Sequence, residues 1–170
     1  MAEGRTFLFA GKPVTLEGPE LKVGDKAPNA ELVANDRSKV TLDAYKGKVR
    51  LISVVPSLDT GVCDAQTRKF NEAAANLGDH VVVLTISADL PFAQSRWCGA
   101  AGVDRVITLS DHYSMSFGQA YGTYIKELRL ESRAVFVVDS SDTIVHVEYV
   151  PEAGQHPNYE AALNAAKSAK

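Results

Sequence analysis

Cysteine and long hydrophobic runs are scarce in this sequence. Two cysteines in 170 residues cannot build the disulfide framework that holds many small secreted domains together. No apolar run approaches the roughly 20 residues that a membrane-spanning helix needs. The first residues also lack the charged start and apolar stretch of a secretory signal. These absences favour a cytoplasmic protein that does not enter a membrane.

Clusters of positive charge are missing as well. The chain has 18 Lys and Arg against 21 Asp and Glu, which gives a formal net charge of −3. Nucleic-acid-binding domains carry a basic face or stripe, so no nucleic acid is expected as a partner. A metal chaperone would need cysteines close in sequence, and none is followed within four residues by a second. The histidines are scattered over positions 80, 112, 146 and 156, so neither a metal nor another cofactor is expected.

The hydrophobic pattern alternates between strand-like and helix-like segments. An N-terminal hairpin is expected over about 5–17, with its turn at 10–13. Runs of Val, Ile and Leu predict buried strands, and apolar residues spaced three and four apart predict helices. The predicted strands are 49–55, 81–86, 106–108, 134–138 and 143–150, and the predicted helices are 61–77, 91–98, 114–121 and 159–166.

This order of elements determines the predicted fold class. A strand–helix–strand crossover in the middle and a strand pair near the end indicate a mixed sheet with helices on both faces. The expected fold is therefore α/β, a thioredoxin-like mixed sheet flanked by helices, with an added N-terminal β-hairpin. A length of 170 residues suits one domain spanning 1–170.

The segment from Pro56 to Cys63 carries the most chemical information. It lies where a predicted buried strand ends and a helix begins, and ligands bind at that edge of open α/β sheets. With Asp59 or Thr60 as the helix cap, Cys63 falls in the first turn. Unpaired backbone N–H groups and the helix dipole favour negative charge there, hence the nucleophilic thiolate. A polar first turn, with Asp64 next to it, argues against deep burial of Cys63.

The spacing Pro-x-x-x-Thr-x-x-Cys over 56–63 resembles the peroxidatic signature of the peroxiredoxins. Segments 87–96, 132–135 and 159–163 are similar to the thiol peroxidase branch, which contains atypical two-cysteine enzymes. The resemblance covers essentially the whole chain. It implies reduction of hydrogen peroxide and organic hydroperoxides, and a homodimer. It also overturns the simpler interpretation that both cysteines are small buried hydrophobes.

The resemblance also implies roles for five residues. Cys63 is the nucleophile, Cys98 the thiol that resolves its sulfenic acid through an intramolecular disulfide, and thioredoxin the reductant. Thr60 orients the peroxide, Pro56 shields the pocket, and Arg133 faces the sulfur. The alternative for Arg133 is a surface ion pair with Glu127 or Glu131, which is the usual role of an arginine.

Two residues next to the cysteines also carry expectations. Asp64 should oppose the thiolate slightly, and it is expected to point outward. Trp97 shares a helix face with Ala93, so it should pack inward, with Cys98 about 100° further round the helix.

A non-enzymatic peroxide sensor or holdase on the same fold stays open as an alternative function. It would use the same two cysteines, so the sequence separates it poorly from an enzyme. Steady-state peroxide consumption with thioredoxin and its reductase distinguishes the two. The preferred peroxide cannot be inferred from the sequence.

Overall fold

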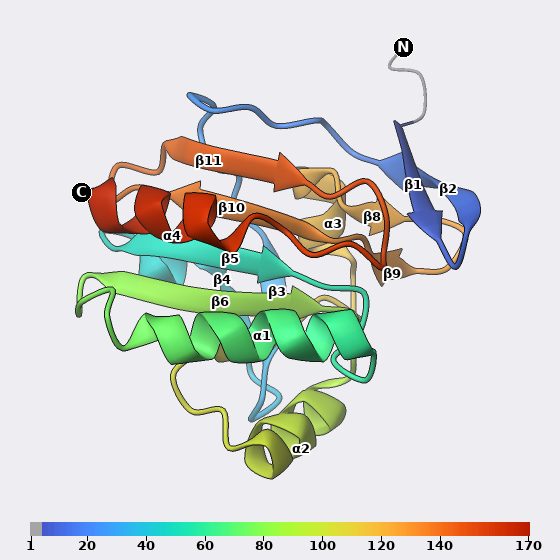
Figure 1. Ribbon diagram of the computed structural model, residues 1–170, viewed down its shortest axis with the longest axis horizontal. Coiled ribbons are helices and arrows are strands. Elements are labelled where there is room, and N and C mark those ends of the chain that lie inside the picture. The colour runs from blue at the N-terminus through green and yellow to red at the C-terminus, as the bar shows by residue number, and fades with distance from the viewer. Residues whose placement is uncertain (1–4) are drawn as a thin grey trace.

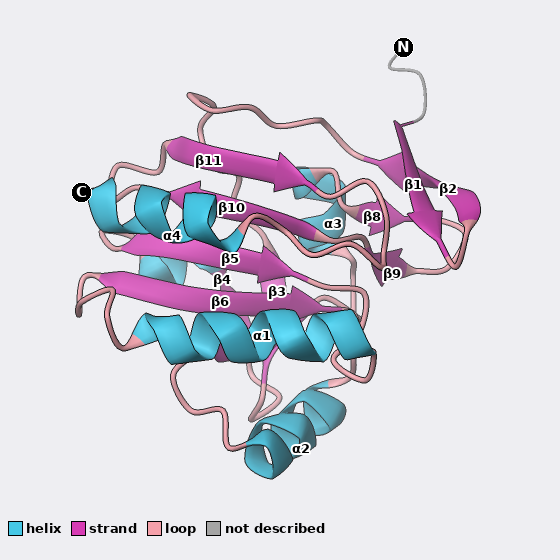
Figure 2. Ribbon diagram, in the orientation of Figure 1, coloured by secondary structure: helices cyan, strands magenta, loops and turns pink. Residues whose placement is uncertain are grey.

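The computed structural model describes residues 5–170 and shows helices packed around a large mixed sheet, with a smaller sheet beside it (Figure 1 and Figure 2). The large sheet has seven strands in the order β11-β10-β5-β6-β7-β3-β4. Its strands are β3 (Glu31–Ala34), β4 (Lys39–Thr41), β5 (Val49–Val54), β6 (Val81–Ser87), β7 (Ile107–Ser110), β10 (Ala134–Val138) and β11 (Ile144–Tyr149).

The connections within this sheet follow the order predicted from the sequence. Strands β5, β6 and β7 are parallel and are joined through α1 (Gly61–Ala74) and α2 (Pro91–Ala101). Strand β10 pairs antiparallel with both β5 and β11. The expected mixed, thioredoxin-like sheet is confirmed.

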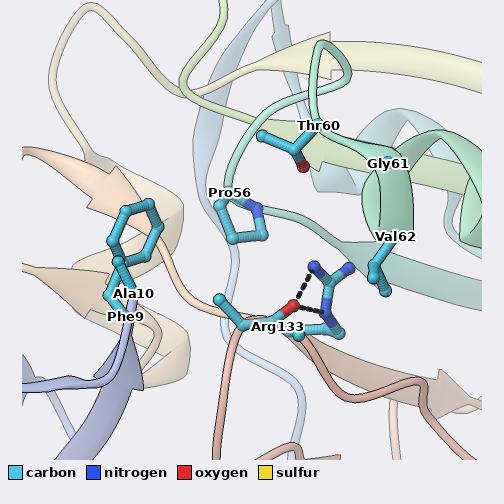
Figure 3. A pocket seen from close by; sticks show the side chains of 9 residues that line it. Phe9, Ala10, Pro56, Thr60, Gly61, Val62 and Arg133 are labelled. Carbon is cyan, nitrogen blue, oxygen red and sulfur yellow. Dashed lines mark hydrogen bonds between the residues drawn. The ribbon is translucent and has the colours of Figure 1, made fainter.

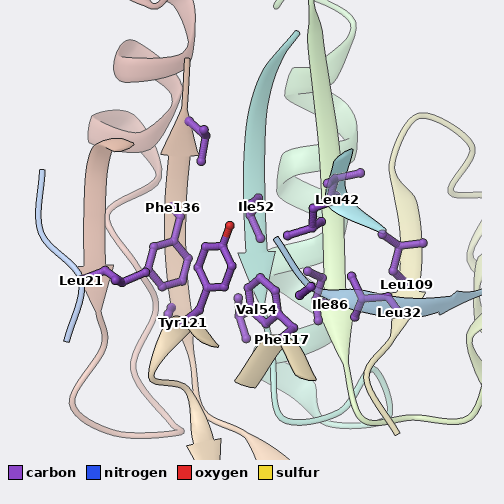
Figure 4. Packing of buried hydrophobic residues seen from close by; sticks show 14 of the residues in the cluster. Leu21, Leu32, Leu42, Ile52, Val54, Ile86, Leu109, Phe117, Tyr121 and Phe136 are labelled. Carbon is purple, nitrogen blue, oxygen red and sulfur yellow. The ribbon is translucent and has the colours of Figure 1, made fainter. Parts of the chain in front are cut away.

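Two hydrophobic cores lie on opposite faces of the sheet. One packs against α1 and α4 (Tyr159–Ser168), where Leu51 meets Phe70 and Ala162. The other packs against α3 (Ser116–Tyr121), where Ile52 belongs to the same cluster as Tyr121 (Figure 4). Successive strand residues point to opposite faces, so a strand covered on both faces needs apolar residues at nearly every position. This explains why β10 is apolar throughout and why β5 is apolar except at Arg50 and Ser53.

The N-terminal hairpin is also confirmed, with strands β1 (Arg5–Phe9) and β2 (Lys12–Glu17). Its turn consists of Ala10 and Gly11, with φ of 52° and 78°, and is shorter than the predicted 10–13. Two left-handed residues match the twist of a two-residue hairpin. The backbone of Leu8 exchanges hydrogen bonds with Pro151 and Ala153, which fixes the hairpin to the segment after β11.

Several short elements differ from the sequence prediction. Helix α1 ends at Ala74 rather than at 77, because tighter turns over 73–77 lead into Gly78, which has a φ of 89°. The strands β8 (Tyr124–Ile125) and β9 (Leu130–Glu131) extend the hairpin into a four-stranded sheet. Strands of two to four residues are too short to show a period. In the part of the chain from 5 to 170, no helix has the length and apolarity to cross a membrane.

A buried arginine on β5 ties the sheet to the turn between β10 and β11. Arg50 is 4% exposed, and its Nη2 donates to Asp142 Oδ1 at 2.7 Å and to the Asp139 carbonyl at 2.7 Å. The hydrogen bond from Arg50 lowers the pKa of Asp142 more than burial raises it. A lowered carboxyl pKa means that the ion pair stabilises the fold above the unfolded pKa of about 3.9, and that this stability is lost as the pH falls through the folded value.

We predict that Asp142→Asn lowers the free energy of unfolding by about 1 kcal/mol near pH 7, since a hydrogen bond to a charged group is worth about 1.5–3 kcal/mol and partial exposure reduces it. The difference from the parent protein should shrink as the pH falls below the unfolded carboxyl pKa of about 3.9. Urea unfolding at several pH values measures it, with Asp104→Asn as a charge-matched control. A difference that stays constant over this range would contradict the assignment to the ion pair.

Candidate active site

The candidate nucleophile lies at the junction between β5 and α1. Strand β5 ends at Val54, and Cys63 is the third residue of α1. Its side chain is fully buried in a small cluster with Val55 and Leu58, against which Trp97 packs. The expectation that Cys63 would avoid deep burial is therefore wrong. The loop that follows β5 folds its apolar side chains back over the first turn of the helix.

Arg133 reaches the sulfur from the start of β10. It is 1% exposed, and its Nη2 donates to Cys63 Sγ at 3.2 Å. Its Nη1 donates to Gln66 Oε1 at 2.9 Å. Its Nε and Nη2 also donate to the Ala153 carbonyl, at 3.1 and 2.6 Å. Two separate segments of the chain, α1 and the segment after β11, therefore fix the plane of the guanidinium group.

The alternative of a surface ion pair for Arg133 is wrong. Glu127 accepts hydrogen bonds from the backbone N–H of Thr15. Burial, and then the neighbouring Asp111, raise the pKa of Glu131 well above its ordinary value, which favours its neutral form. Among residues 5–170, no carboxylate lies within ion-pair distance of Arg133. The buried guanidinium is instead satisfied by Gln66, by the Ala153 carbonyl and by the Cys63 sulfur.

Gln66 is a site residue that the sequence reasoning missed. It is fully buried, and its Nε2 donates to Ser53 Oγ on β5 at 2.7 Å, while its Oε1 accepts from Arg133. Gln66 follows Cys63 by three residues, so both lie on one helix face. A polar residue on the same face as Phe70 was the signal in the sequence that could have identified it.

A pocket of about 310 Å³ lies between the N-terminal hairpin and the first turn of α1. Figure 3 shows the hairpin turn on one side, the β5–α1 loop on the other and the Arg133 guanidinium beside Val62. Cys63 is not one of its lining residues, but Arg133, which contacts the sulfur, is. The lining residues are Phe9, Ala10, Pro56, Thr60, Gly61, Val62, Arg133, Ala153 and Gly154.

Thr60 and Pro56 both lie in this wall. Thr60 is the N-cap residue of α1, but its side chain makes no cap hydrogen bond; its hydroxyl instead donates to the Ser57 carbonyl at 3.1 Å. The expected side-chain cap is therefore absent at Thr60. Pro56 is buried at the end of the strand. The structure thus brings Pro56, Thr60 and Arg133 together around one cavity, with Cys63 in contact with Arg133.

The second cysteine lies apart from this group, on α2. Cys98 is half-buried, and its sulfur lies 3.6 Å from Thr108 Oγ1 on β7. Both cysteines are free thiols. In the order of the sheet, β5 and β6 separate β7 from β10, next to which Arg133 lies. The two sulfurs therefore contact different parts of the sheet.

Comparison with known proteins places these features in a family. The Redoxin family profile matches residues 22–163. The chain is 66% identical to the thiol peroxidase of Halalkalibacterium halodurans over 164 residues, which is 96% of this chain and 98% of that protein. It is 62% identical to the thiol peroxidase of Bacillus subtilis over 160 residues, or 94% and 95% of the two chains. The crystal structure of a peroxiredoxin-like protein from Aquifex aeolicus superposes with a TM-score of 0.88 at 41% identity, covering 96% of each chain.

We predict that Gln66→Met lowers the free energy of unfolding by about 1–3 kcal/mol, because it leaves a buried N–H of Arg133 and the Ser53 hydroxyl without a partner. Urea unfolding measures the loss. Thr67→Val is the matched control: Thr67 is the next residue, is equally buried, and donates only to the Cys63 carbonyl. That change should cost about 0.5–1.5 kcal/mol, the net worth of an ordinary hydrogen bond. Equal losses in both variants would mean that Gln66 contributes nothing beyond one local bond.

Proposed function

Because this chain belongs to the redoxin family, and within it to the thiol peroxidase branch of the peroxiredoxins, we propose that Cys63 is the residue that attacks peroxide. The contact between the Arg133 guanidinium and the Cys63 sulfur, at 3.2 Å and shielded from water, carries this proposal. The thiolate is the nucleophilic form of cysteine, and the Arg133 guanidinium directs a hydrogen-bond donor at the sulfur. It is also already in place when charge develops during the reaction, so no reorganisation is needed then.

In the first step the thiolate attacks one peroxide oxygen, and a sulfur–oxygen bond forms while the oxygen–oxygen bond breaks. The departing oxygen takes up the electron pair and a proton and leaves as water or as an alcohol. Cys63 becomes a sulfenic acid. The Arg133 guanidinium and the backbone N–H of Cys63 stabilise the charge on the oxygens, and the Thr60 hydroxyl joins them when it turns away from the Ser57 carbonyl. Removing one such donor typically costs about 10²–10³ in rate.

The composition of the pocket suits both substrate classes. Phe9, Ala10 and Val62 make its wall apolar, which accommodates the carbon chain of an organic hydroperoxide, while Thr60 and Arg133 supply polar groups close to the sulfur. Pro56 lies between the cavity and the end of β5 and keeps water from the thiolate. A pocket of about 310 Å³ is at the lower end of the size range of small-molecule sites, which favours small hydroperoxides.

In the second step the Cys98 thiol attacks the sulfenic sulfur of Cys63. The sulfur–sulfur bond forms, and the hydroxyl leaves with the thiol proton as water, which yields an intramolecular disulfide. Thioredoxin then reduces the disulfide by thiol–disulfide exchange and restores both thiols. Thioredoxin as the reductant, the homodimer and a cytoplasmic location rest on the family resemblance.

We predict that Cys63→Ser abolishes peroxide reduction, because no nucleophile remains. Cys98→Ser should consume about one equivalent of peroxide per chain and then stop, because the sulfenic acid has no resolving thiol. Peroxide consumption coupled to thioredoxin, its reductase and NADPH measures both. Normal turnover of Cys98→Ser in this assay would contradict the resolving role. Failure of the parent protein to turn over would favour the sensor or holdase function.

The second step also predicts the connectivity of the disulfide. After one equivalent of peroxide, a denaturing gel without reductant should show a monomer of altered mobility, because both thiols belong to one chain. Cys98→Ser should keep the mobility of the reduced monomer. A disulfide-linked dimer as the main product would instead place the resolving thiol on a second copy of the chain.

A further inference from the structure

Three side chains fasten the N-terminal part of α1 to α2. The indole N–H of Trp97 donates to Asp64 Oδ1 at 2.9 Å. Arg68 donates from its Nε to Asp64 Oδ2 at 2.8 Å, and its guanidinium lies over the Trp97 ring, 5.6 Å from the centroid. Arg68 also donates to the carbonyl of Ala101 near the end of α2, at 3.3 Å. We call Asp64, Arg68 and Trp97 the interhelix clasp.

The contacts of the interhelix clasp test what the sequence led us to expect of Asp64 and Trp97. Asp64 points away from Cys63, as expected, but its carboxylate is engaged by Trp97 and Arg68 rather than free in solvent. Trp97 packs inward against the apolar residues around both α1 and Cys63, and its one polar atom is the donor of the clasp. The charge of Asp64 is therefore compensated on the side away from the sulfur.

The position of the clasp in the sequence gives it a mechanical consequence. Asp64 directly follows Cys63, and Trp97 directly precedes Cys98. Neighbouring helix residues point about 100° apart, so the two thiols turn away from each other when Asp64 and Trp97 face each other. The contacts agree, because Cys63 meets Arg133 and Cys98 meets Thr108. A disulfide needs sulfurs about 2.05 Å apart and Cα atoms within about 7 Å.

We propose that the interhelix clasp holds the arrangement in which Cys63 attacks peroxide, and that its release limits the rate of disulfide formation with Cys98. This inference rests on the proposed function of the two cysteines. Closed clasp and disulfide exclude each other, because each requires a different pair of side chains to face across the boundary between α1 and α2. Asp64, Arg68 and Trp97 are thus positioning residues that act on the second step.

The clasp thereby sets the fate of the sulfenic acid. While the clasp is closed, a second peroxide can oxidise Cys63–SOH to the sulfinic acid, transferring one oxygen and leaving as water or alcohol. Once it opens, Cys98 forms the disulfide and releases water. A tighter clasp favours over-oxidation, and a looser clasp favours the disulfide. The clasp is also partly solvent-exposed, with Arg68 at 47% and Asp64 at 34%, so it can open without disturbing either core.

Two variants test the proposal, and each removes a different hydrogen bond of the interhelix clasp. Trp97→Phe removes the indole donor but keeps an aromatic ring, and Arg68→Met removes the cation from the surface of α1. Arg96→Met is the matched control, because it removes the same charge from an exposed position of α2 next to Trp97. The protein reacts with one equivalent of peroxide in a single turnover, and samples are quenched at successive times. Alkylation and intact-protein mass spectrometry then give the amounts of thiol, sulfenic acid and disulfide.

We expect both clasp variants to form the disulfide about three- to tenfold faster than the parent protein, as the loss of one partly exposed charged hydrogen bond allows. The rate at which Cys63 is first oxidised should change less than twofold. The peroxide concentration that over-oxidises half of the protein should rise by the same three- to tenfold factor. Arg96→Met should match the parent protein in all three measurements.

Disulfide formation at the parent rate in both clasp variants would overturn the proposal, as would an equal acceleration in Arg96→Met. If Trp97→Phe does not fold, Arg68→Met decides alone, because its side chain is half-exposed. A role in general stability would slow both steps or neither, whereas the clasp changes only the second. Failure of the parent protein to oxidise at Cys63 would overturn the proposed function, and the inference with it.

Discussion

A positive charge buried without a carboxylate is the constraint around which the site is built. The Arg133 guanidinium must place its donors on uncharged acceptors or on sulfur, because an unpaired buried charge is very costly. Gln66 on α1, the carbonyl of Ala153 after β11 and the Cys63 sulfur supply those acceptors. Correct packing of α1 on the sheet and correct docking of the segment after β11 therefore satisfy one group together. Stability of the fold and placement of the nucleophile depend on the same interactions.

The sequence predicted the parts of this arrangement that repeat a local pattern. The strands β5, β6 and β10 could be predicted because burial on both faces requires apolar residues at most positions. The strand–helix junction at Cys63 followed from their order. The position of Gln66 on the apolar face of α1 was visible in the sequence, but its partner was not, because Arg133 lies 67 positions further along the chain. The burial of Cys63 was misjudged for a related reason. Polar neighbours in sequence describe the first turn of a helix, whereas Val55 and Leu58 cover it only after the loop has folded back.

The two cysteines lie beside contacts of different kinds, buried hydrogen bonds around Cys63 and partly exposed ones between α1 and α2. Cys63 is held from the core side by buried bonds of Arg133 and Gln66, whereas α2 meets α1 through the partly exposed interhelix clasp. Helix α2 also covers less apolar surface, since only Pro91 and Gln94 of its residues are buried. Local opening is drawn from segments with few buried contacts. The proposed nucleophile thus lies on the firmly packed helix and the proposed resolving thiol on the weakly packed one.

Because the carbonyl that orients Arg133 belongs to Ala153, late in the chain, the site can form only near the end of synthesis. During synthesis Cys63 leaves the ribosome long before Ala153, whose carbonyl orients Arg133. The segment that contains Ala153 also binds the N-terminal hairpin through the backbone of Leu8. The first and the last strands of the chain must therefore both be available before the pocket has two walls. A nascent chain that stops at β10 has its thiol and its arginine, but neither is yet aimed at the other. The site is therefore complete only after the segment that follows β11 has been synthesised and has docked.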